Sequence, residues 1–324
     1  MPLVPFARRL TWTLAPFTAG CEGVQSTFST FGVEAESTRA LALIMGIGAS
    51  LITIAVLLLA AHAVRAPEGQ LDHRRGMRLI LWLGAVFPTV VLSVLLVVSL
   101  PGMRSIASEP HDLRVRVDGE QFWWRMKYEQ PGSATVETAN ELRIPMDRTV
   151  AIRLGSPDVI HSFWVPGLAG KVDMIPGREN ELVVRATRTG VFRGQCTEFC
   201  GLSHALMAFD VIVMESKDFD EWLSAASQPA TSNDSTGRRL FEEYGCDGCH
   251  IVRGHVQGTP IGPDLTHYGS RRTLGAGTVP LTAEATSRFI RNPAALKPGA
   301  LMPRFGTMSE ADADAIAAYL LELK

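Results

Sequence analysis

Residues 196–207 have the sequence CTEFCGLSHALM, which brings four potential metal ligands into one short loop. The cysteines Cys196 and Cys200 are followed by His204 and Met207. Soft sulfur ligands combined with imidazole and a weak methionine ligand select copper, as in blue-copper proteins. A mononuclear blue-copper site uses one cysteine, so the second thiolate indicates two coppers that share a pair of bridging sulfurs.

The second copper of such a pair needs another histidine. His161, in the segment HSFW at residues 161–164, lies on an earlier stretch that can fold back to the loop. Zinc is disfavoured because methionine is a poor zinc ligand. The alternative is a disulfide between Cys196 and Cys200, with both histidines as ordinary surface residues, since disulfides are the default in an oxidising compartment.

The sequence around this loop predicts β structure over residues 111–217. Leu113, Val115 and Val117 alternate with polar residues, which is the period of a half-buried strand. Glycine and proline separate further short apolar runs. The pattern predicts an antiparallel sandwich or barrel.

Two apolar runs precede the β region and predict a pair of transmembrane helices within residues 40–104. Residues 40–64 and 79–103 each contain 25 residues without Asp, Glu, Lys or Arg, and about 20 apolar residues are enough for a helix to span a bilayer. The connecting loop, 65–78, carries four arginines against two acidic residues. The positive-inside rule therefore places this loop in the cytoplasm and everything after residue 104 on the other side. Pro88 should kink the second helix.

A second cysteine motif follows the β region. Residues 246–250 have the sequence CDGCH, the attachment signature of c-type haem. Two thioethers from Cys246 and Cys249 would hold the porphyrin edge, and His250 would reach the iron. Zinc would need a second pair of Cys or His nearby, and a redox dithiol would need a thioredoxin-like βαβ setting, so haem is favoured over both alternatives.

The haem iron needs a second axial ligand from downstream. A methionine opposite histidine raises the haem potential and suits electron transfer. We expect Met302 to be this ligand because the following Pro303 fixes an extended loop that can present it. Met308 is the competing candidate, and core packing is the alternative role for either methionine.

The haem motif lies in a small domain predicted over residues 237–324. Residues 224–236 are small, polar and almost uncharged, which is typical of a flexible linker. Ser309 and Asp312 form a capping-box-like start to a terminal helix. A mostly helical domain of this size has a modest core and often needs a cofactor to complete it.

The N-terminal residues 1–20 form a candidate signal peptide, because arginines precede a short apolar stretch. Residues 18–21, TAGC, resemble a bacterial lipoprotein cleavage box in which Cys21 becomes the lipidated first residue. The alternatives are an ordinary signal peptide or an unprocessed terminus with an inert Cys21.

Composition excludes two broad classes. The 324 residues include 31 Lys plus Arg and 33 Asp plus Glu, a formal net charge of −2. A nucleic-acid-binding protein would need a basic surplus to neutralise phosphates. A hydrophobic content of 46% with 20% charged residues excludes a disordered chain.

Three stretches carry a family resemblance: GEQFWW at 119–124, HSFWVPGLAGKVDMIPGREN at 161–180 and GQCTEFCGLSHALM at 194–207. The chain resembles subunit II of bacterial haem–copper cytochrome c oxidases, in the form with a cytochrome c domain fused at the C-terminus. The resemblance implies a two-helix transmembrane hairpin, an all-β cupredoxin-like (Greek-key) domain and a small all-α class I cytochrome c domain.

The resemblance also implies the ligands of a dinuclear copper centre, CuA: two bridging cysteines, two histidines and, as weak axial ligands, a methionine sulfur and a backbone carbonyl. In that order these residues are Cys196, Cys200, His161, His204, Met207 and Glu198. The Glu198 carboxylate is implied to reach a magnesium ion at the boundary with subunit I. Residues 262–265, GPDL, resemble the cytochrome c loop whose proline carbonyl orients the haem histidine.

The aromatic stretch departs from the family pattern. Phe122 occupies the position that usually holds the exposed tryptophan through which electrons enter, and Trp123 and Trp124 follow it. We hypothesise that the fused haem replaces a separate cytochrome c and passes electrons to copper in cis. The alternative is that these aromatic residues belong mostly to the sandwich core, because successive strand residues alternate between faces.

The implied partners are subunit I, where oxygen is reduced, subunit III, and an upstream donor such as a cytochrome or the bc complex. The implied location is the bacterial inner membrane, with the copper and haem domains on the extracytoplasmic side. One alternative is a CuA-bearing subunit of a nitric-oxide reductase. Another, from a different class, is a membrane-tethered copper chaperone, which would need open and exchangeable ligands.

Overall fold

The computed structural model divides the chain into two compact units, one of residues 36–108 and one that combines the residues up to 35 with those from 109 onward. The residues that it describes are 23, 25–67, 69, 72–100, 110–129 and 135–324. The predicted signal peptide and Cys21 lie outside the described residues.

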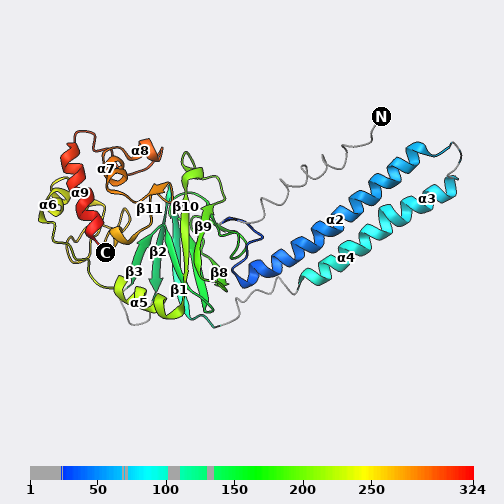
Figure 1. The fold of residues 1–324 in the computed structure, drawn as a ribbon, viewed down its shortest axis with the longest axis horizontal. Coiled ribbons are helices and arrows are strands. Elements are labelled where there is room, and N and C mark those ends of the chain that lie inside the picture. Colours follow the sequence, from blue (N-terminus) through cyan, green and yellow to red (C-terminus); the bar gives the residue numbers. More distant parts are fainter. Residues whose placement is uncertain (1–22, 24, 68, 70–71, 101–109, 130–134) are drawn as a thin grey trace, which may run out of the picture. The chain divides into compact units, whose positions relative to one another are not determined.

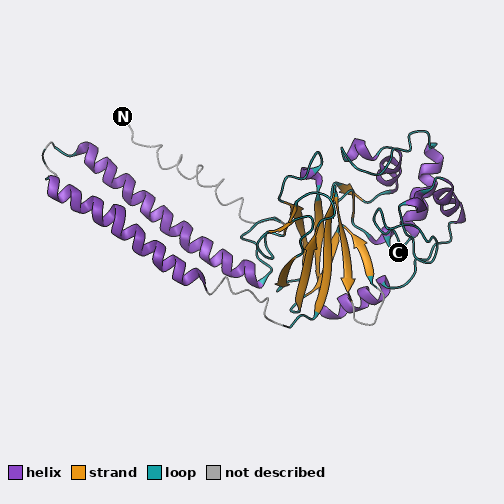
Figure 2. Cartoon of the chain, turned by 180° about the vertical axis from the view of Figure 1, so that it is seen from behind, coloured by secondary structure: helices purple, strands orange, loops and turns teal. Residues whose placement is uncertain are grey.

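The larger unit contains a sandwich of two five-stranded sheets (Figure 1, Figure 2). The first sheet, in spatial order, consists of β3 (Val136–Ala139), β2 (Trp123–Glu129), β1 (Leu113–Glu120), β5 (Thr149–Gly155) and β8 (Asn180–Arg185). The second consists of β4 (Glu141–Pro145), β10 (Ala208–Met214), β9 (Gly190–Cys196), β6 (His161–Trp164) and β7 (Val172–Met174). This is the expected cupredoxin-like architecture.

Both sheets are mixed, so the prediction of a purely antiparallel sandwich was wrong. β1 pairs with β5 in parallel, and β10 pairs with β4 in parallel. The remaining strand pairs of the sandwich are antiparallel. Apolar alternation has a period of two in either direction and therefore carries no information on strand direction. The chain passes repeatedly from one sheet to the other, which places strands distant in sequence side by side.

Aromatic side chains fill the space between the sheets. Trp124 and Tyr128 from β2 are fully buried, and the rings of Trp124 and Phe209 lie 4.8 Å apart. Helix α5 (Ser216–Ala226) closes one end of the sandwich, where the ring of Trp222 lies 5.1 Å from that of Tyr128. Each large apolar side chain buried in this way contributes about 1.5–3 kcal/mol.

The haem-motif domain is helical, as predicted, with one small hairpin added. Its helices are α6 (Ser235–Glu243), α7 (Ala283–Arg291), α8 (Pro293–Leu296) and α9 (Glu310–Glu322). The hairpin consists of β11 (Thr273–Leu274) and β12 (Val279–Pro280). The rings of Phe241 on α6 and Tyr319 on α9 lie 6.0 Å apart. The predicted cap is confirmed, because the Ser309 side chain accepts the backbone N–H of Asp312.

The connection between the two domains differs from the predicted flexible linker. Residues 224–226 belong to α5, and residues 235–236 belong to α6. Between the helices the chain is hydrogen-bonded to the haem-motif domain, because the Arg253 guanidinium donates to the carbonyls of Ala226 and Ser227 at 2.7 and 3.0 Å. The composition of the linker could not show this, since the side chain that holds it lies further along the chain.

The smaller unit consists of two apolar helical segments. One is α2 (Val33–Arg65), which begins in the larger unit, and the other runs through α3 (His73–Leu81), η1 (Trp82–Val86) and α4 (Phe87–Ser99). Their most apolar stretches have mean hydropathies of 2.6 and 2.5. Both segments are therefore long and apolar enough to cross a membrane. A π-helical turn, η1, ends two residues before Pro88, where the sequence predicts a kink.

Candidate copper and haem sites

The second sheet brings the sulfur-rich loop and the upstream histidine together. His161 begins β6 and Cys196 ends β9, and these two strands are paired, with Phe163 opposite Cys196. The loop then returns to β10 through a short 3-10 turn over His204–Leu206. Because β9 lies between β6 and β10, residues 35 positions apart reach the same point.

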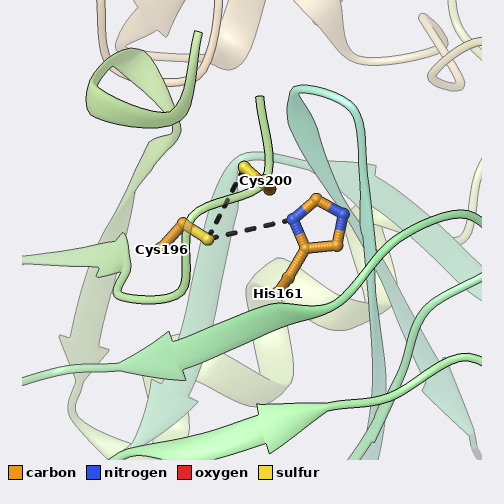
Figure 3. Close-up of side chains that lie close together, drawn as sticks. All are labelled: His161, Cys196 and Cys200. Carbon is orange, nitrogen blue, oxygen red and sulfur yellow. Dashed lines mark hydrogen bonds between the residues drawn. The ribbon is translucent and has the colours of Figure 1, made fainter. Parts of the chain in front are cut away.

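The predicted copper ligands converge in this corner, and Figure 3 shows three of them, His161, Cys196 and Cys200. The sulfur atoms of Cys196 and Cys200 lie 3.9 Å apart. His161 Nδ1 lies 3.8 Å from the Cys196 sulfur, and His204 Nδ1 lies 3.6 Å from the Cys200 sulfur. The Met207 sulfur is 3.8 Å from that of Cys200.

The donor set fits copper. The Glu198 backbone carbonyl lies 3.2 Å from the Cys196 sulfur and completes the predicted group. Both cysteines are buried and free, and their sulfur separation of 3.9 Å exceeds the disulfide bond length of about 2.05 Å. The alternative of a Cys196–Cys200 disulfide is therefore absent from this structure. Thiolates, imidazoles and a thioether together favour copper over zinc.

A carboxylate behind the copper ligands fixes the orientation of the buried histidine. Asp158 Oδ1 accepts a hydrogen bond from His161 Nε2 at 2.9 Å, which leaves Nδ1 facing the sulfurs. Burial lowers the pKa of His161, but the hydrogen bonds to Asp158 and Cys196 outweigh it and raise the pKa to about 9. The hydrogen bond with Cys200, aided by His161, lowers the pKa of the Cys196 thiol. The thiolate form that metals require is thus favoured at Cys196, whereas the same hydrogen bond and burial raise the pKa of the Cys200 thiol.

The haem-motif residues line a separate cavity of about 280 Å³. Cys246, Cys249 and His250 lie on one part of its wall, and Met302 on another. His250 Nδ1 donates to the Pro263 carbonyl at 2.8 Å, as the resemblance implied. Burial lowers the pKa of His250, although the Pro263 hydrogen bond acts in the opposite direction. The neutral imidazole therefore keeps Nε2 free to bind a metal.

The glycine before Pro263 is required by the close approach of this imidazole. A Cβ atom on Gly262 would lie 2.6 Å from His250 Cε1, closer than real Cβ atoms come. Only glycine allows the loop to bring the Pro263 carbonyl to the histidine ring. Residues 262 and 263 thus act together in holding His250.

Unpartnered polar atoms in the wall fit the carboxylates of a haem. The Arg271 guanidinium donates to the Asp264 carbonyl, but its Nε atom is buried without a hydrogen-bond partner. The Thr273 hydroxyl is also buried without a partner, and both side chains line the cavity. Buried donors without partners are rare in folded proteins. A haem propionate, which is an acceptor of such bonds, suits these donors.

The two candidate methionines occupy different environments. Met302 is half-buried and lines the same cavity as the haem motif. Met308 is 2% exposed and packs in the core of the domain, outside the cavity lining. This placement favours Met302 as the iron ligand and assigns Met308 to packing.

The three aromatic residues divide between the cavity and the core. Phe122 and Trp123 line the haem cavity, whereas Trp124 is fully buried in the sandwich core, 6.0 Å from Phe163 between ring centroids. The Arg125 guanidinium lies 4.7 Å from the centre of the Trp123 ring. Phe122 lies just before β2 and also belongs to the buried sandwich core, so strand alternation separates only Trp123 from Trp124.

Sequence reasoning missed the residues that support these ligands. Asp158 lies in no motif, and Gln121 lies in the stretch 119–124 but had no role assigned to it, yet Asp158 accepts the backbone N–H of Gln121 at 2.7 Å. The Gln121 side-chain amide donates to the Cys200 carbonyl at 2.5 Å. The only available signal was the short spacing between Asp158 and His161, which is too common to identify a partner.

A cupredoxin-like sandwich with a two-cysteine copper loop, followed by a c-type haem domain, defines a class of membrane-anchored electron-transfer proteins. Residues 125–216 match the family model described as cytochrome c oxidase subunit II, periplasmic domain, and residues 235–324 match cytochrome c. The chain belongs to the cytochrome c oxidase subunit 2 family.

Relatives of known family agree with this assignment. The chain is 38% identical over 250 residues to cytochrome c oxidase subunit 2 of Alkalihalophilus pseudofirmus, covering 74% of this chain and 71% of that protein. It is 31% identical over 253 residues to the Bacillus subtilis protein of the same name, covering 74% and 70%. The periplasmic domain of the Bradyrhizobium japonicum subunit, CoxB, is 33% identical with a TM-score of 0.34, covering 36% of this chain and 94% of that one.

Proposed function

We propose that this chain is the subunit through which electrons enter a respiratory haem–copper oxidase. Cys246, Cys249, His250 and Met302 would hold haem c, and the loop at 196–207 with His161 would hold the dinuclear copper centre. Electrons would pass within the chain from the first site to the second, and from there to the haem of subunit I, where oxygen is reduced to water.

One observation carries this proposal: the haem cavity and the copper loop share a wall. The Phe122 ring lies between Gly201 on the copper loop and Gly299 on the haem side, where an added Cβ would be 3.0 and 3.1 Å from it. Gln121 lines the same cavity and bonds to the Cys200 carbonyl. A direct path through these two residues joins the sites without a separate carrier.

On the copper side, the residues of this chain supply a closed and rigid donor set. When bound, the copper pair supplies one-electron exchange in which the charge is shared over two metals and two sulfurs. Cys196 and Cys200 provide the bridging sulfurs, and Asp158 keeps His161 Nδ1 turned toward them. Hydrogen bonds to the far side of a ligating histidine typically raise metal affinity and fix the ring.

On the haem side, the chain attaches the group and sets its axial ligands. When bound, haem c supplies a second one-electron centre, whose potential a His–Met ligand pair raises. Pro263 orients His250, and the Arg271 and Thr273 donors suit the propionates. These residues would hold the haem in one orientation within the cavity.

The remaining parts of the chain connect it to the membrane and to its partners. The two apolar helices would anchor it in the bacterial inner membrane as a hairpin, with the arginine-rich loop 65–78 in the cytoplasm and both soluble domains outside. The side chain of Glu198, beside the copper loop, would reach magnesium at the boundary with subunit I. Subunit III and an upstream cytochrome or the bc complex complete the set of proposed partners.

The relatives' names favour oxygen rather than nitric oxide as the final acceptor, because they are cytochrome c oxidase subunits. The test is electron paramagnetic resonance on the purified complex, with copper and haem quantified. We expect two coppers with one unpaired electron shared over both, and one covalent haem. A single localised copper would instead support the chaperone, and a C200S variant, which keeps only one of the two cysteines, is the control that should lack the shared-electron signal.

A further inference from the structure

A lysine is buried where the haem domain meets the copper loop. Lys297 is 4% exposed, although lysines are rarely buried without a charged partner. Its Nζ atom donates to the Leu206 carbonyl at 3.0 Å and to the Gly275 carbonyl at 2.6 Å. Both partners are main-chain oxygens, so the contact depends on the path of the backbone.

The three segments that Lys297 joins are those that hold the two cofactor sites. Leu206 immediately precedes the copper ligand Met207, and Gly275 lies in the turn between β11 and β12. Lys297 itself follows α8 and leads into the segment that carries Met302. Its side chain also lines the haem cavity, so it lies between the cavity and the copper loop.

Two neighbouring hydrogen bonds also run from the copper-loop side to main-chain carbonyls of the haem domain. The hydroxyl of Ser203, which is 1% exposed, donates to the Pro298 carbonyl at 2.6 Å. The backbone N–H of Ala208 donates to the Ala276 carbonyl at 3.1 Å. A shift of one domain against the other would leave these buried polar groups without partners. The hydrogen bonds therefore favour one relative position of the two domains.

A further contact holds the histidine side of the haem cavity. The Arg125 guanidinium of the sandwich donates to the carbonyls of Pro260 and Ile261 at 3.0 and 3.1 Å. These residues immediately precede Gly262 and Pro263, which orient His250. The two domains are therefore fixed together on both sides of the cavity.

On the basis of the proposed function, we propose that Lys297 is a positioning residue for electron transfer. It holds the Met302 segment against the copper loop. The haem domain then donates electrons from a docked position and not from the end of a flexible tether. Electron transfer is sensitive to the separation and orientation of the two centres. A bond from one lysine to both sides of the junction sets these quantities directly.

The contact is compatible with either protonation state of the side chain. Burial lowers the pKa of Lys297 to about 7, and the nearby Cys200 acts in the opposite direction. An ammonium has three N–H donors and a neutral amine has two, which is enough for the two carbonyls. The positioning role therefore does not depend on the charge.

The test uses the whole oxidase with Lys297→Met, which retains the length of the side chain but removes its donors. A single electron is injected photochemically, and haem oxidation is followed together with copper reduction. We expect the haem-to-copper rate to fall severalfold, because the electronic coupling between two centres weakens as their separation grows. Lys217→Met, at a side chain that is 85% exposed on α5, is the matched control and should leave the rate unchanged.

A positioning role predicts three further results. The copper resonance signal and the haem attachment of K297M should match those of the wild type, and Lys297→Arg should restore part of the rate because arginine also donates to carbonyls. A wild-type rate in K297M overturns the proposal. If K297M does not assemble, the same measurement is made on Ser203→Ala. This variant should also lower the haem-to-copper rate, by a smaller factor. An unchanged rate in S203A overturns the proposal. Absence of haem-to-copper transfer in the wild type would instead reject the proposed function.

Discussion

The copper loop and the haem cavity differ in how much of each site the protein supplies before its cofactor is bound. In the copper loop, sulfur and nitrogen ligands already contact one another at 3.6–3.9 Å within a packed sandwich. In the haem domain, the ligands surround a cavity of about 280 Å³ with unpartnered polar atoms in its wall. Copper therefore binds to a site that the fold has already formed, whereas haem fills the core of its domain.

The largest expected effect tests this difference through loss of haem. The double variant Cys246→Ala/Cys249→Ala should leave the cavity empty, and at about 24 cal/mol per Å³ an empty volume of 280 Å³ costs up to about 7 kcal/mol. That loss is comparable to the stability of a whole domain. Limited proteolysis should then cleave residues 237–324 and spare the sandwich. Removing copper with a chelator is the control, and equal sensitivity of both domains would contradict the comparison.

The two methionines sharpen the comparison within the haem domain. Met308→Ala removes a buried core side chain and should lower the free energy of unfolding by about 2–5 kcal/mol. Met302→Ala should destabilise the domain much less but lower the haem reduction potential, because the axial sulfur is lost. Thermal unfolding and redox titration of both variants separate the roles. A lowered potential in M308A with an unchanged one in M302A would reverse the assignment.

The shared wall can be tested at two adjacent aromatic residues. Phe122→Ala removes the ring between the copper loop and Gly299, and we expect haem-to-copper transfer to slow because the packed path between the sites is interrupted. Trp123→Ala also alters the cavity wall but leaves that contact intact, so its effect should be clearly smaller. Single-electron injection into both variants gives the rates. Equal rates in F122A and the wild type would remove Phe122 from the route.

The smallest expected effect concerns the support of the copper ligands. Asp158→Asn weakens the hydrogen bond to His161 Nε2 and should lower copper affinity by about 10–100-fold, while haem attachment stays unchanged. Copper titration of the variant measures the affinity. Asp173→Asn, at an exposed carboxylate paired with Lys171, is the control. If both variants bind copper as the wild type does, Asp158 has no role at the site.

The copper loop could be predicted from sequence because its ligands lie close together along the chain and differ in chemistry from ordinary core residues. His161 was inferred because a second copper needs another histidine, and strand pairing then brought it to the loop. The haem motif was equally visible, since CDGCH has few other uses. Strand direction was not, because alternation is the same for parallel and antiparallel neighbours.

The junction between the domains left no trace in the sequence. The bonds from Lys297, Ser203 and Arg125 all end on main-chain carbonyls, which every residue possesses. No motif can therefore mark the acceptor side. The small polar residues of the linker predicted a mobile domain. Composition could not predict the hydrogen bonds from Arg253 that hold the start of this linker.

The central claim, electron transfer from haem to copper within one chain, is tested most directly by diluting the purified oxidase in the single-electron injection experiment. If both centres belong to one docked unit, the rate of haem oxidation stays constant across dilution and equals the rate at which the copper signal changes. A rate that falls in proportion to protein concentration, or haem oxidation without any copper signal, would contradict the account.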